Sequence, residues 1–581
     1  MRGMGVDNSP HYATLPHSLW ETVLQRVDDV RSIASLACCS REFYELAASD
    51  VVWKHAYQAA SCHAAANGTC GVGMPNPCWK HIYKLKQELE ACWREGRCAE
   101  SRLCGHQDYI RCLELHPPQG PGQGARVISA SGSFEEADCS IRVWDVGSGA
   151  CHERLVGHEG PIWCMQSDGG RLVASAGDDG TLRLWDLHTH RVGVSRLLGP
   201  NRLSCLSWDI AAGRLAAGSA EGGVAVWSVD TILESLEEEV RAVGEGGAGE
   251  DAPALQAVEY DCPEGGGEGA QPLQEETDFP VWREVALDAA DPPTVARVPP
   301  PHAASWPAVT CMQLEGDLLV TGEGGGEGRV HMWTLSPASD PQDSSPATPP
   351  LWRSHPATTT PSRTSSLSGS CSNASRRSCS SVAISRRRSS DGGWDWSHGR
   401  HAVLPRVAAT LAPHKGGVSC LVHQPESGLL AVGSALGEIR LWDVSRCLPL
   451  HTLGGHTRDV LCMQLGSTAR AAGPWSGQLL ASGSADKTVR TWDARQGGGS
   501  CSVQKLKSMP YCLQVEGYRA AAGCADGKVY VWDLRGITKK PLVLPGHRDR
   551  VWALAMDAST LVSAGLDGNI ILRSFLPAAG A

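Results

Sequence analysis

Residues 455–494 read GHTRDVLCMQLGSTARAAGPWSGQLLASGSADKTVRTWDA, and this stretch decides the fold. A Gly-His pair opens it, short runs of β-type residues follow, and an Ala-Asp turn precedes a run that ends in Trp-Asp. Residues 157–187 repeat these features in the same order, from Gly157-His158 to Trp185-Asp186. Such self-similarity indicates a chain built from repeated units.

Tryptophans that end short β-type runs mark the repeat along the chain. They are Trp144, Trp185, Trp227, Trp333, Trp442, Trp492 and Trp532, and Arg573 takes the equivalent position of an eighth run. Four of the intervals between these positions are 40 to 42 residues, whereas two exceed 100 residues and contain inserts at 231–305 and 336–405. Without the inserts, the 328 residues left between 104 and 576 divide into eight units of 41.

These units resemble WD repeats, whose usual length is about 40 to 45 residues. The resemblance implies an all-β propeller over 104–576, and eight blades is the count that the spacing predicts. A blade is a four-stranded antiparallel sheet that cannot cover its own faces, so blades stack around an axis. The family's buried tetrad is matched in two repeats, by His158, Ser175, Asp179 and Trp185, and by His456, Ser482, Asp486 and Trp492.

A Ser-His-Asp hydrolase is an alternative interpretation of those tetrads. The set recurs from blade to blade, whereas a catalytic triad is needed once, so we expect the groups to satisfy one another as buried polar atoms. Three repeats depart from the pattern. Leu436 stands at the Asp position of blade 5, blade 7 has no Gly-His pair, and blade 8 has no tryptophan.

The two inserts differ in composition and are both expected to lack a packed core. Residues 231–305 hold 17 Asp and Glu against 3 Arg, and residues 336–405 hold 19 Ser. Because the acidic excess is local, the remaining chain is only slightly basic, which favours neither nucleic acid nor membrane as a partner. Phosphorylation of Ser390, beside Arg387 and Arg388, is a hypothesis that competes with a simple solvated loop.

Cysteine positions favour a reducing compartment, and the chain start shows no secretory signal, so we expect a cytoplasmic or nuclear protein. Seven cysteines share one strand phase: Cys112, Cys164, Cys205, Cys311, Cys420, Cys462 and Cys512. A zinc site is the alternative for the cysteines near His63 and His81, but no Cys-x-x-Cys pair is present among them; they are Cys62, Cys70, Cys78, Cys92, Cys98 and Cys104. We expect no metal and no cofactor.

The first hundred residues have helical apolar spacing instead of the repeat. Residues 15–57 begin with Leu15-Pro16, where a proline suits the start of a helix, and contain Trp53 near their end. This segment resembles an F-box, expected over 12–57, and a helical linker is expected over 58–103. The order of F-box, linker and propeller resembles the F-box/WD-repeat substrate receptors of SCF ubiquitin ligases; a helical hairpin that only caps the propeller is the alternative.

The resemblance implies a non-catalytic subunit whose F-box binds the Skp adaptor of a cullin complex while the propeller holds a protein substrate with a short degron. The residues expected at the adaptor contact are Leu15, Pro16, Leu19, Leu24, Val27, Leu36 and Trp53. A WD-repeat scaffold for another complex is the runner-up, and a hydrolase is a distant third.

For the substrate, strand alternation points to the residue before each phased cysteine, which should face the channel or its upper rim. These rim residues are Arg111, Trp163, Ser204, Thr310, Ser419, Leu461 and Tyr511, with Trp552 in blade 8. Family members that bind phosphorylated degrons place several arginines here, whereas this chain keeps only Arg111. The aromatic residues predict a less phosphate-directed rim, although Arg202, Arg458, Arg548 and Arg550 in the approach loops could add positive charge. Blade packing is the alternative role of the aromatics.

Overall fold

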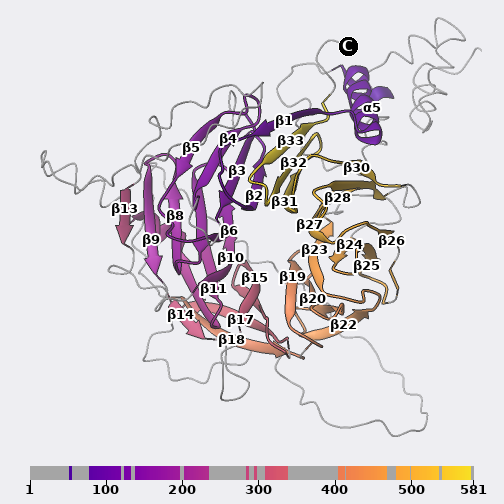
Figure 1. Cartoon of the computed structure of the whole chain (residues 1–581). Helices are drawn as coiled ribbons and strands as arrows, with labels where there is room; N and C mark the ends of the chain where they lie inside the picture. The colour runs from indigo at the N-terminus through magenta and orange to yellow at the C-terminus, as the bar shows by residue number, and fades with distance from the viewer. Residues whose placement is uncertain are drawn as a thin grey trace, which may run out of the picture.

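The structure is a computed structural model of the chain, and its sheets form a closed ring around a central axis (Figure 1). It describes residues 52–54, 78–118, 124–132, 138–196, 202–234, 283–286, 294–297, 308–326, 328–337, 403–412, 414–466, 479–497, 499–500, 502–534 and 540–576. Eight sheets are present in this part of the chain, which confirms the predicted eight-bladed propeller.

Each blade has four antiparallel strands, of which the first lies nearest the axis and the last lies outermost. Blade 1 contains β2 (Ile110–His116), β3 (Arg126–Ser131), β4 (Ile141–Asp145) and β5 (Cys151–Leu155). Blade 2 contains β6 (Ile162–Ser167), β7 (Leu172–Gly177), β8 (Thr181–Asp186) and β9 (Arg191–Arg196). Blade 3 contains β10 (Leu203–Asp209), β11 (Arg214–Ser219), β12 (Gly223–Ser228) and β14 (Thr294–Arg297). Blade 4 contains β15 (Val309–Glu315), β16 (Leu318–Glu323), β17 (Val330–Pro337) and β18 (Val403–Leu411).

The second half of the ring follows the same order. Blade 5 contains β19 (Val418–Gln424), β20 (Leu429–Ser434), β21 (Ile439–Asp443) and β22 (Leu448–Leu453). Blade 6 contains β23 (Val460–Gly466), β24 (Leu479–Ser484), β25 (Thr488–Asp493) and β26 (Ser502–Lys505). Blade 7 contains β27 (Pro510–Glu516), β28 (Arg519–Cys524), β29 (Val529–Asp533) and β30 (Leu542–Leu544). Blade 8 contains β31 (Val551–Met556), β32 (Thr560–Gly565), β33 (Ile570–Ser574) and β1 (Ala99–Leu103).

The hydrophobic core lies between neighbouring blades. Trp185 of blade 2, for example, is fully buried in one cluster with Ile128 and Val143 of blade 1. The central strands of a blade carry apolar residues on both faces. Each face is covered by a neighbouring blade, which removes these residues from water.

The phased cysteines pack against small residues of the neighbouring strand. Cys462 pairs with Gly483 across β23 and β24, and a Cβ on that glycine would lie only 2.7 Å from the thiol sulfur. Burial raises the pKa of Cys112 and of Cys512 to about 12, so these thiols stay protonated and inert. Every cysteine that the structure describes is a free thiol.

The predicted helical linker over 58–103 is partly wrong. A helix, α5, covers Trp79–Glu95 and ends at Gly96. Residues Ala99–Leu103, however, form a strand, β1, that pairs with β33 near the end of the sequence. This strand completes blade 8, so the propeller begins at residue 99 and not at 104. The strand was not predicted because only Leu103 of its five residues is buried, so apolar and polar residues do not alternate along it.

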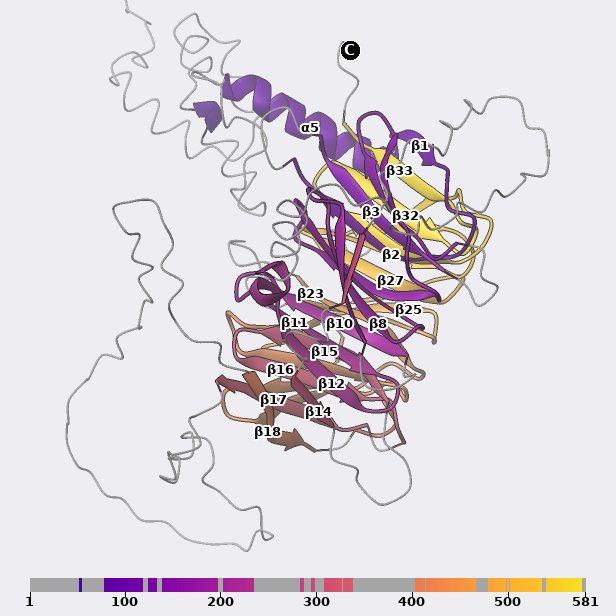
Figure 2. The ribbon, with the colours of Figure 1, turned by 90° about the vertical axis from the view of Figure 1, so that its left-hand side faces the viewer.

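The expected insert boundaries also need correction, because strands of the sheets come from inside them. The first insert supplies the outer strand of blade 3, β14, and a further strand, β13 (Arg283–Ala286), which pairs in parallel with β9. Residues 229–234 are helical. In the second insert, the first residues belong to β17 and the last residues belong to β18. In the side view of Figure 2, α5 and the helical segment 229–234 lie on the same side of the ring.

Candidate functional site

The eight predicted rim residues share one backbone feature: each is the extra residue of a β-bulge at the start of an innermost strand. In blade 1, for instance, Ile110 pairs with Ser131 and Cys112 with Ala130, so Arg111 has no partner across the strands. The other seven blades have the same register shift at the same place. A bulge takes its extra residue out of the regular alternation of the strand, so these eight side chains share one orientation that the flanking paired residues lack.

In blades 3 to 5 the rim residues are hydroxyls that bind the next blade. The Thr310 hydroxyl donates to the carbonyl oxygens of Val418, at 2.7 Å, and of Gly322, at 3.2 Å. Ser419 donates in the same way to Val460, at 2.6 Å, and Ser204 donates to Val309. These three hydroxyls use their protons to join neighbouring blades, and Leu461 of blade 6 is apolar, so the rim residues of blades 3 to 6 offer a ligand no charge.

The other half of the rim is an aromatic stack interleaved with arginines, which we call the aromatic arc. The guanidinium carbon of Arg111 lies 4.2 Å from the ring centroid of Trp163 and 5.6 Å from that of Trp552. Trp552 stacks on Tyr511 with centroids 5.0 Å apart and planes at 17°. The arc therefore joins blades 7, 8, 1 and 2, and its rings hold Arg111 in a cation–π contact.

Two outer arginines extend the aromatic arc into the approach loops. Arg202 lies 4.8 Å over Trp163 and pairs with Asp178 at 3.4 Å, and the same Asp178 oxygen accepts from Trp163 Nε1 at 3.1 Å. Arg550 lies 6.0 Å over Tyr511. These arginines are exposed, whereas Arg111 and the rings are half-buried.

Arg111 is the central charge of the aromatic arc. Its Nε donates to the carbonyl oxygen of Gly132 at 3.3 Å, and within the described residues no carboxylate forms an ion pair with it. Burial lowers the pKa of its guanidinium, yet an arginine stays protonated at neutral pH. Asp108 and Asp178 act on this charge from beyond ion-pair distance, so the half-buried guanidinium can still contact an anionic group of a ligand.

The buried tetrads form continuous hydrogen-bonded chains. In blade 1 Trp144 Nε1 donates to Ser129 Oγ at 2.9 Å, Ser129 and His106 Nε2 are 2.8 Å apart, and His106 Nδ1 lies 2.9 Å from Asp138. Burial lowers the pKa of His106; burial alone would raise that of Asp138, but its hydrogen bonds and neighbouring charges lower it. The pair is therefore a neutral imidazole and a carboxylate.

Blades 2 and 6 hold the two predicted tetrads with the same geometry, with His158 and His456 each 2.8 Å from the serine oxygen. The serines of blades 1, 2 and 6 are fully buried, and each already accepts from a tryptophan. A serine without access to substrate cannot act as a nucleophile, so the tetrads are structural.

Sequence reasoning missed the tetrad of blade 1 and its variant in blade 8. The signal that both share is an aspartate six residues before the tryptophan position: Asp138 before Trp144, and Asp567 before Arg573. In blade 8 the Arg573 side chain, 1% exposed, lies 3.4 Å from Ser563 and pairs with Glu100 of β1 at 3.2 Å. The arginine thus takes over the tryptophan's position and ties the last blade to the first strand.

Most residues expected at the adaptor contact lie outside the described part of the chain: Leu15, Pro16, Leu19, Leu24, Val27 and Leu36. Trp53 is described, in a short helical segment over 52–54. Its ring is 8% exposed and lies 5.5 Å from the ring of Tyr83 on α5, with Lys80 at 5.6 Å. Trp53 therefore packs on α5.

No group of three or more His, Cys, Asp and Glu side chains is placed to hold a metal ion within the described ranges. Cys62, Cys70 and His63 of the alternative zinc interpretation lie outside them. Among the described helices, none has the length and apolar character that crossing a bilayer requires.

Comparison with known families identifies the repeat. Five segments match the family described as WD domain, G-beta repeat, and they cover residues 97–145, 149–186, 406–443, 447–493 and 538–573. The ring is thus an eight-bladed β-propeller made of WD repeats. The same comparison detects no F-box domain.

Individual relatives match short parts of the chain. Protein SPA1-RELATED 3 of Arabidopsis thaliana is 37% identical over 141 residues, which are 23% of this chain and 16% of that protein. The F-box/WD repeat-containing protein pof1 of Schizosaccharomyces pombe is 37% identical over 70 residues, 12% of this chain and 10% of that protein. The chain therefore spans less than two thirds of the length of these curated relatives. Among solved structures, Sqt1 of Chaetomium thermophilum is 14% identical, with a TM-score of 0.49, and the match covers 82% of this chain and 97% of that one.

Proposed function

We propose that this protein is a non-catalytic substrate-recognition subunit of an SCF-type ubiquitin ligase. The segment over 12–57 binds the Skp adaptor and through it the cullin, and the propeller binds a short degron of a protein substrate at the aromatic arc. The observation that carries the proposal is the one-sided rim, where half-buried Arg111 is held between Trp163 and Trp552 at the bulge end of the innermost strands. Bringing a substrate lysine beside the ubiquitin-conjugating enzyme would make ubiquitin transfer effectively intramolecular.

The attachment of α5 supports this division of labour. Trp93 stacks on Phe575 with ring centroids 3.6 Å apart, and its Nε1 donates to the carbonyl oxygen of Ala558 at 3.0 Å. The Tyr518 hydroxyl donates to Glu90 of α5 at 2.8 Å. Ala558 and Tyr518 lie in turns at the ends of β31 and β27 that are remote from the bulges, so α5 packs on the face opposite the rim.

A fixed α5 suits a receptor, because an adaptor bound on one face and a substrate on the other must keep a constant separation. The match to an F-box/WD repeat-containing protein is in keeping with this role. A WD-repeat scaffold without a ubiquitin-ligase role fits the propeller equally well, since it would use the same rim for a different purpose.

The affinity of the full chain for the Skp adaptor separates the two functions. We expect tight binding that Leu15→Asp abolishes and Pro16→Ala weakens, while circular dichroism of both variants remains that of the folded protein. Trp163→Ala is the matched control, because it changes the rim and should leave adaptor binding unaltered. Well-folded protein that does not bind the adaptor would leave the scaffold function as the better account.

A further inference from the structure

We propose that the rim over blades 5 to 8 binds a protein segment rich in aspartate and glutamate through their ordinary carboxylates. This inference deepens the proposed function by naming the class of substrate. It rests on that function only in the expectation that the bound protein is then ubiquitinated.

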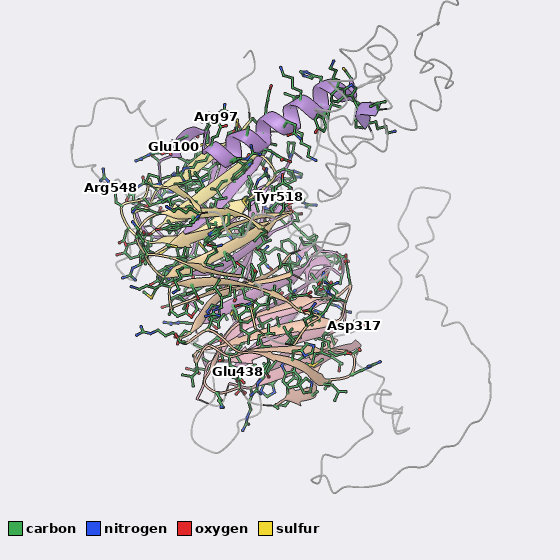
Figure 3. The ribbon with its side chains drawn as sticks, turned by 90° about the vertical axis from the view of Figure 1, so that its right-hand side faces the viewer. Arg97, Glu100, Asp317, Glu438, Tyr518 and Arg548 are labelled. Carbon is green, nitrogen blue, oxygen red and sulfur yellow. The ribbon has the colours of Figure 1, made fainter. Side chains whose placement is uncertain are left out.

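Six exposed cations, which we call the basic crescent, lie in loops at the bulge end of blades 5 to 8. They are Lys415, Arg458, Lys487, Lys507, Arg548 and Arg550. Direct contacts place their loops on one face: Ser484 Oγ donates to the Arg458 carbonyl at 3.0 Å, and Leu566 N donates to the Arg550 carbonyl at 3.0 Å. Figure 3 shows Arg548 at the edge of the ring away from α5, with Tyr518 and Asp317 at the other edge.

The basic crescent carries an excess of positive charge. The same loops expose the carboxylates Asp459 and Asp549, and only the latter is near a crescent side chain, 3.9 Å from Arg550. Asp486 and Asp567 keep their negative charge, but their carboxylates are turned onto tetrad histidines at 2.9 and 3.0 Å and their side chains are only 7% and 6% exposed. The equivalent described loops of blades 1 to 4 expose Glu159 and Glu221 against Arg202, so the charge reverses across the rim.

The distribution of lysine shows that this charge is local. The sequence contains no lysine between Gln87 and His414, although 26 arginines lie in that interval. Lysines reappear at Lys415 and are then frequent in the rim loops of blades 5 to 7. Lysine is a flexible, strongly hydrated point charge, which suits several carboxylates in varied geometry better than one phosphate held by paired arginines.

The aromatic arc argues against nucleic acid as the ligand. Proteins that bind single strands use free aromatic faces on which bases stack. Here Tyr511 and Trp552 stack on each other, and Trp163 lies close to the guanidinium groups of Arg111 and Arg202. The rings therefore already have stacking partners, whereas the cations of the basic crescent are exposed.

The test is fluorescence anisotropy of the full chain with a labelled peptide of about ten glutamates as the probe, whose affinity should fall about tenfold or more as salt rises from about 0.05 to about 0.5 M. The double variant Lys507→Glu/Arg548→Glu should weaken binding at low salt by a further factor of about ten. The matched control is Arg446→Glu/Arg495→Glu, which makes the same charge change in turns of blades 5 and 6 on the opposite face. The control should bind as the unmodified protein does.

Several outcomes would overturn the proposal: no binding of the glutamate peptide, equal losses in both double variants, or tighter binding of oligouridine RNA or of a singly phosphorylated Gly/Ser peptide. Leu15→Asp should bind the glutamate peptide normally. Loss of adaptor binding therefore reports on the ligase role alone, and loss of peptide binding reports on the basic crescent alone.

Discussion

At the scale of single residues, blade 5 lacks the hydrogen-bonding partners that other blades keep around the buried histidine. His414 is 3% exposed, and neither ring nitrogen has a hydrogen-bonding partner in the described structure. Val432 occupies the serine position and Leu436 the aspartate position, so Trp442 Nε1 is also without an acceptor. A buried polar group without a partner costs about 1 to 3 kcal/mol, so blade 5 lacks stabilisation that the tetrads of blades 1, 2 and 6 supply.

This imidazole should make the propeller sensitive to acid. Burial, and then the charge of Arg440, lowers the pKa of His414 to about 4, against about 6.5 in an unfolded chain. The neutral His414 ring therefore favours the folded state fully above its pKa in the unfolded chain. This stabilisation is lost as the pH falls, because the unfolded state takes up the proton first. Between about pH 7 and about pH 5 the protein should lose about 2 kcal/mol more unfolding free energy than His414→Leu does.

Urea unfolding at several pH values measures this difference. His188→Leu, which replaces an exposed histidine, is the control and should follow the unmodified protein. Equal slopes for the protein and for His414→Leu would show that protonation of His414 does not govern acid stability.

The residues also show what sequence reasoning could reach. The tetrads of blades 2 and 6 were predictable because their polar groups occur in order at short spacing. Blade 1 was missed because Asp138 stands nine residues after Ser129, against four residues between serine and aspartate in blades 2 and 6. The rim positions followed from the cysteine phase, but their division into bound hydroxyls and an aromatic arc depends on contacts between blades that no local pattern encodes.

At the scale of elements, β1 closes the ring. It pairs with β33 over five residues, and its one buried residue, Leu103, joins a cluster with Trp144 and Ile570. The sequence could not reveal this pairing, because its partner lies more than 450 residues away and four of its five residues are exposed. The same holds for β14, which an insert separates from the rest of blade 3.

Leu103→Ala should therefore destabilise the whole propeller. Truncation of a buried leucine costs about 2 to 5 kcal/mol, and here the loss weakens the contact that holds both ends of the ring together. Thermal unfolding followed by circular dichroism should show one cooperative transition at lower temperature. Ser101→Ala, at an exposed position of the same strand, should change little. If both variants unfold at the same temperature, the packing of Leu103 on β1 does not hold the ring of blades closed.

At the scale of the whole molecule, the two faces of the ring carry different features. The bulges, the aromatic arc and the basic crescent lie on one face, and α5 packs at the ends of blades 7 and 8 on the other. The strands that flank the two inserts, β12 with β14 and β17 with β18, are joined at the end remote from the bulges. The described strand ends at residues 228 and 294, and at 337 and 403, therefore lie on the face of α5.

Trp93 should decide whether α5 moves with the propeller. It is 4% exposed, lies against Phe575, and has the guanidinium of Arg519 4.9 Å from its ring. Trp93→Ala should cost the docked state about 3 to 5 kcal/mol. The amides of Trp79–Glu95 should then exchange with deuterium much faster, while those of the innermost strands remain protected. Lys84→Ala, at an exposed position of the same helix, should leave exchange unchanged. If the amides of α5 remain protected in Trp93→Ala, the contact with Tyr518 and the chain continuity with β1 are enough to fix the helix. The helix would then stay rigidly attached to the propeller without the tryptophan.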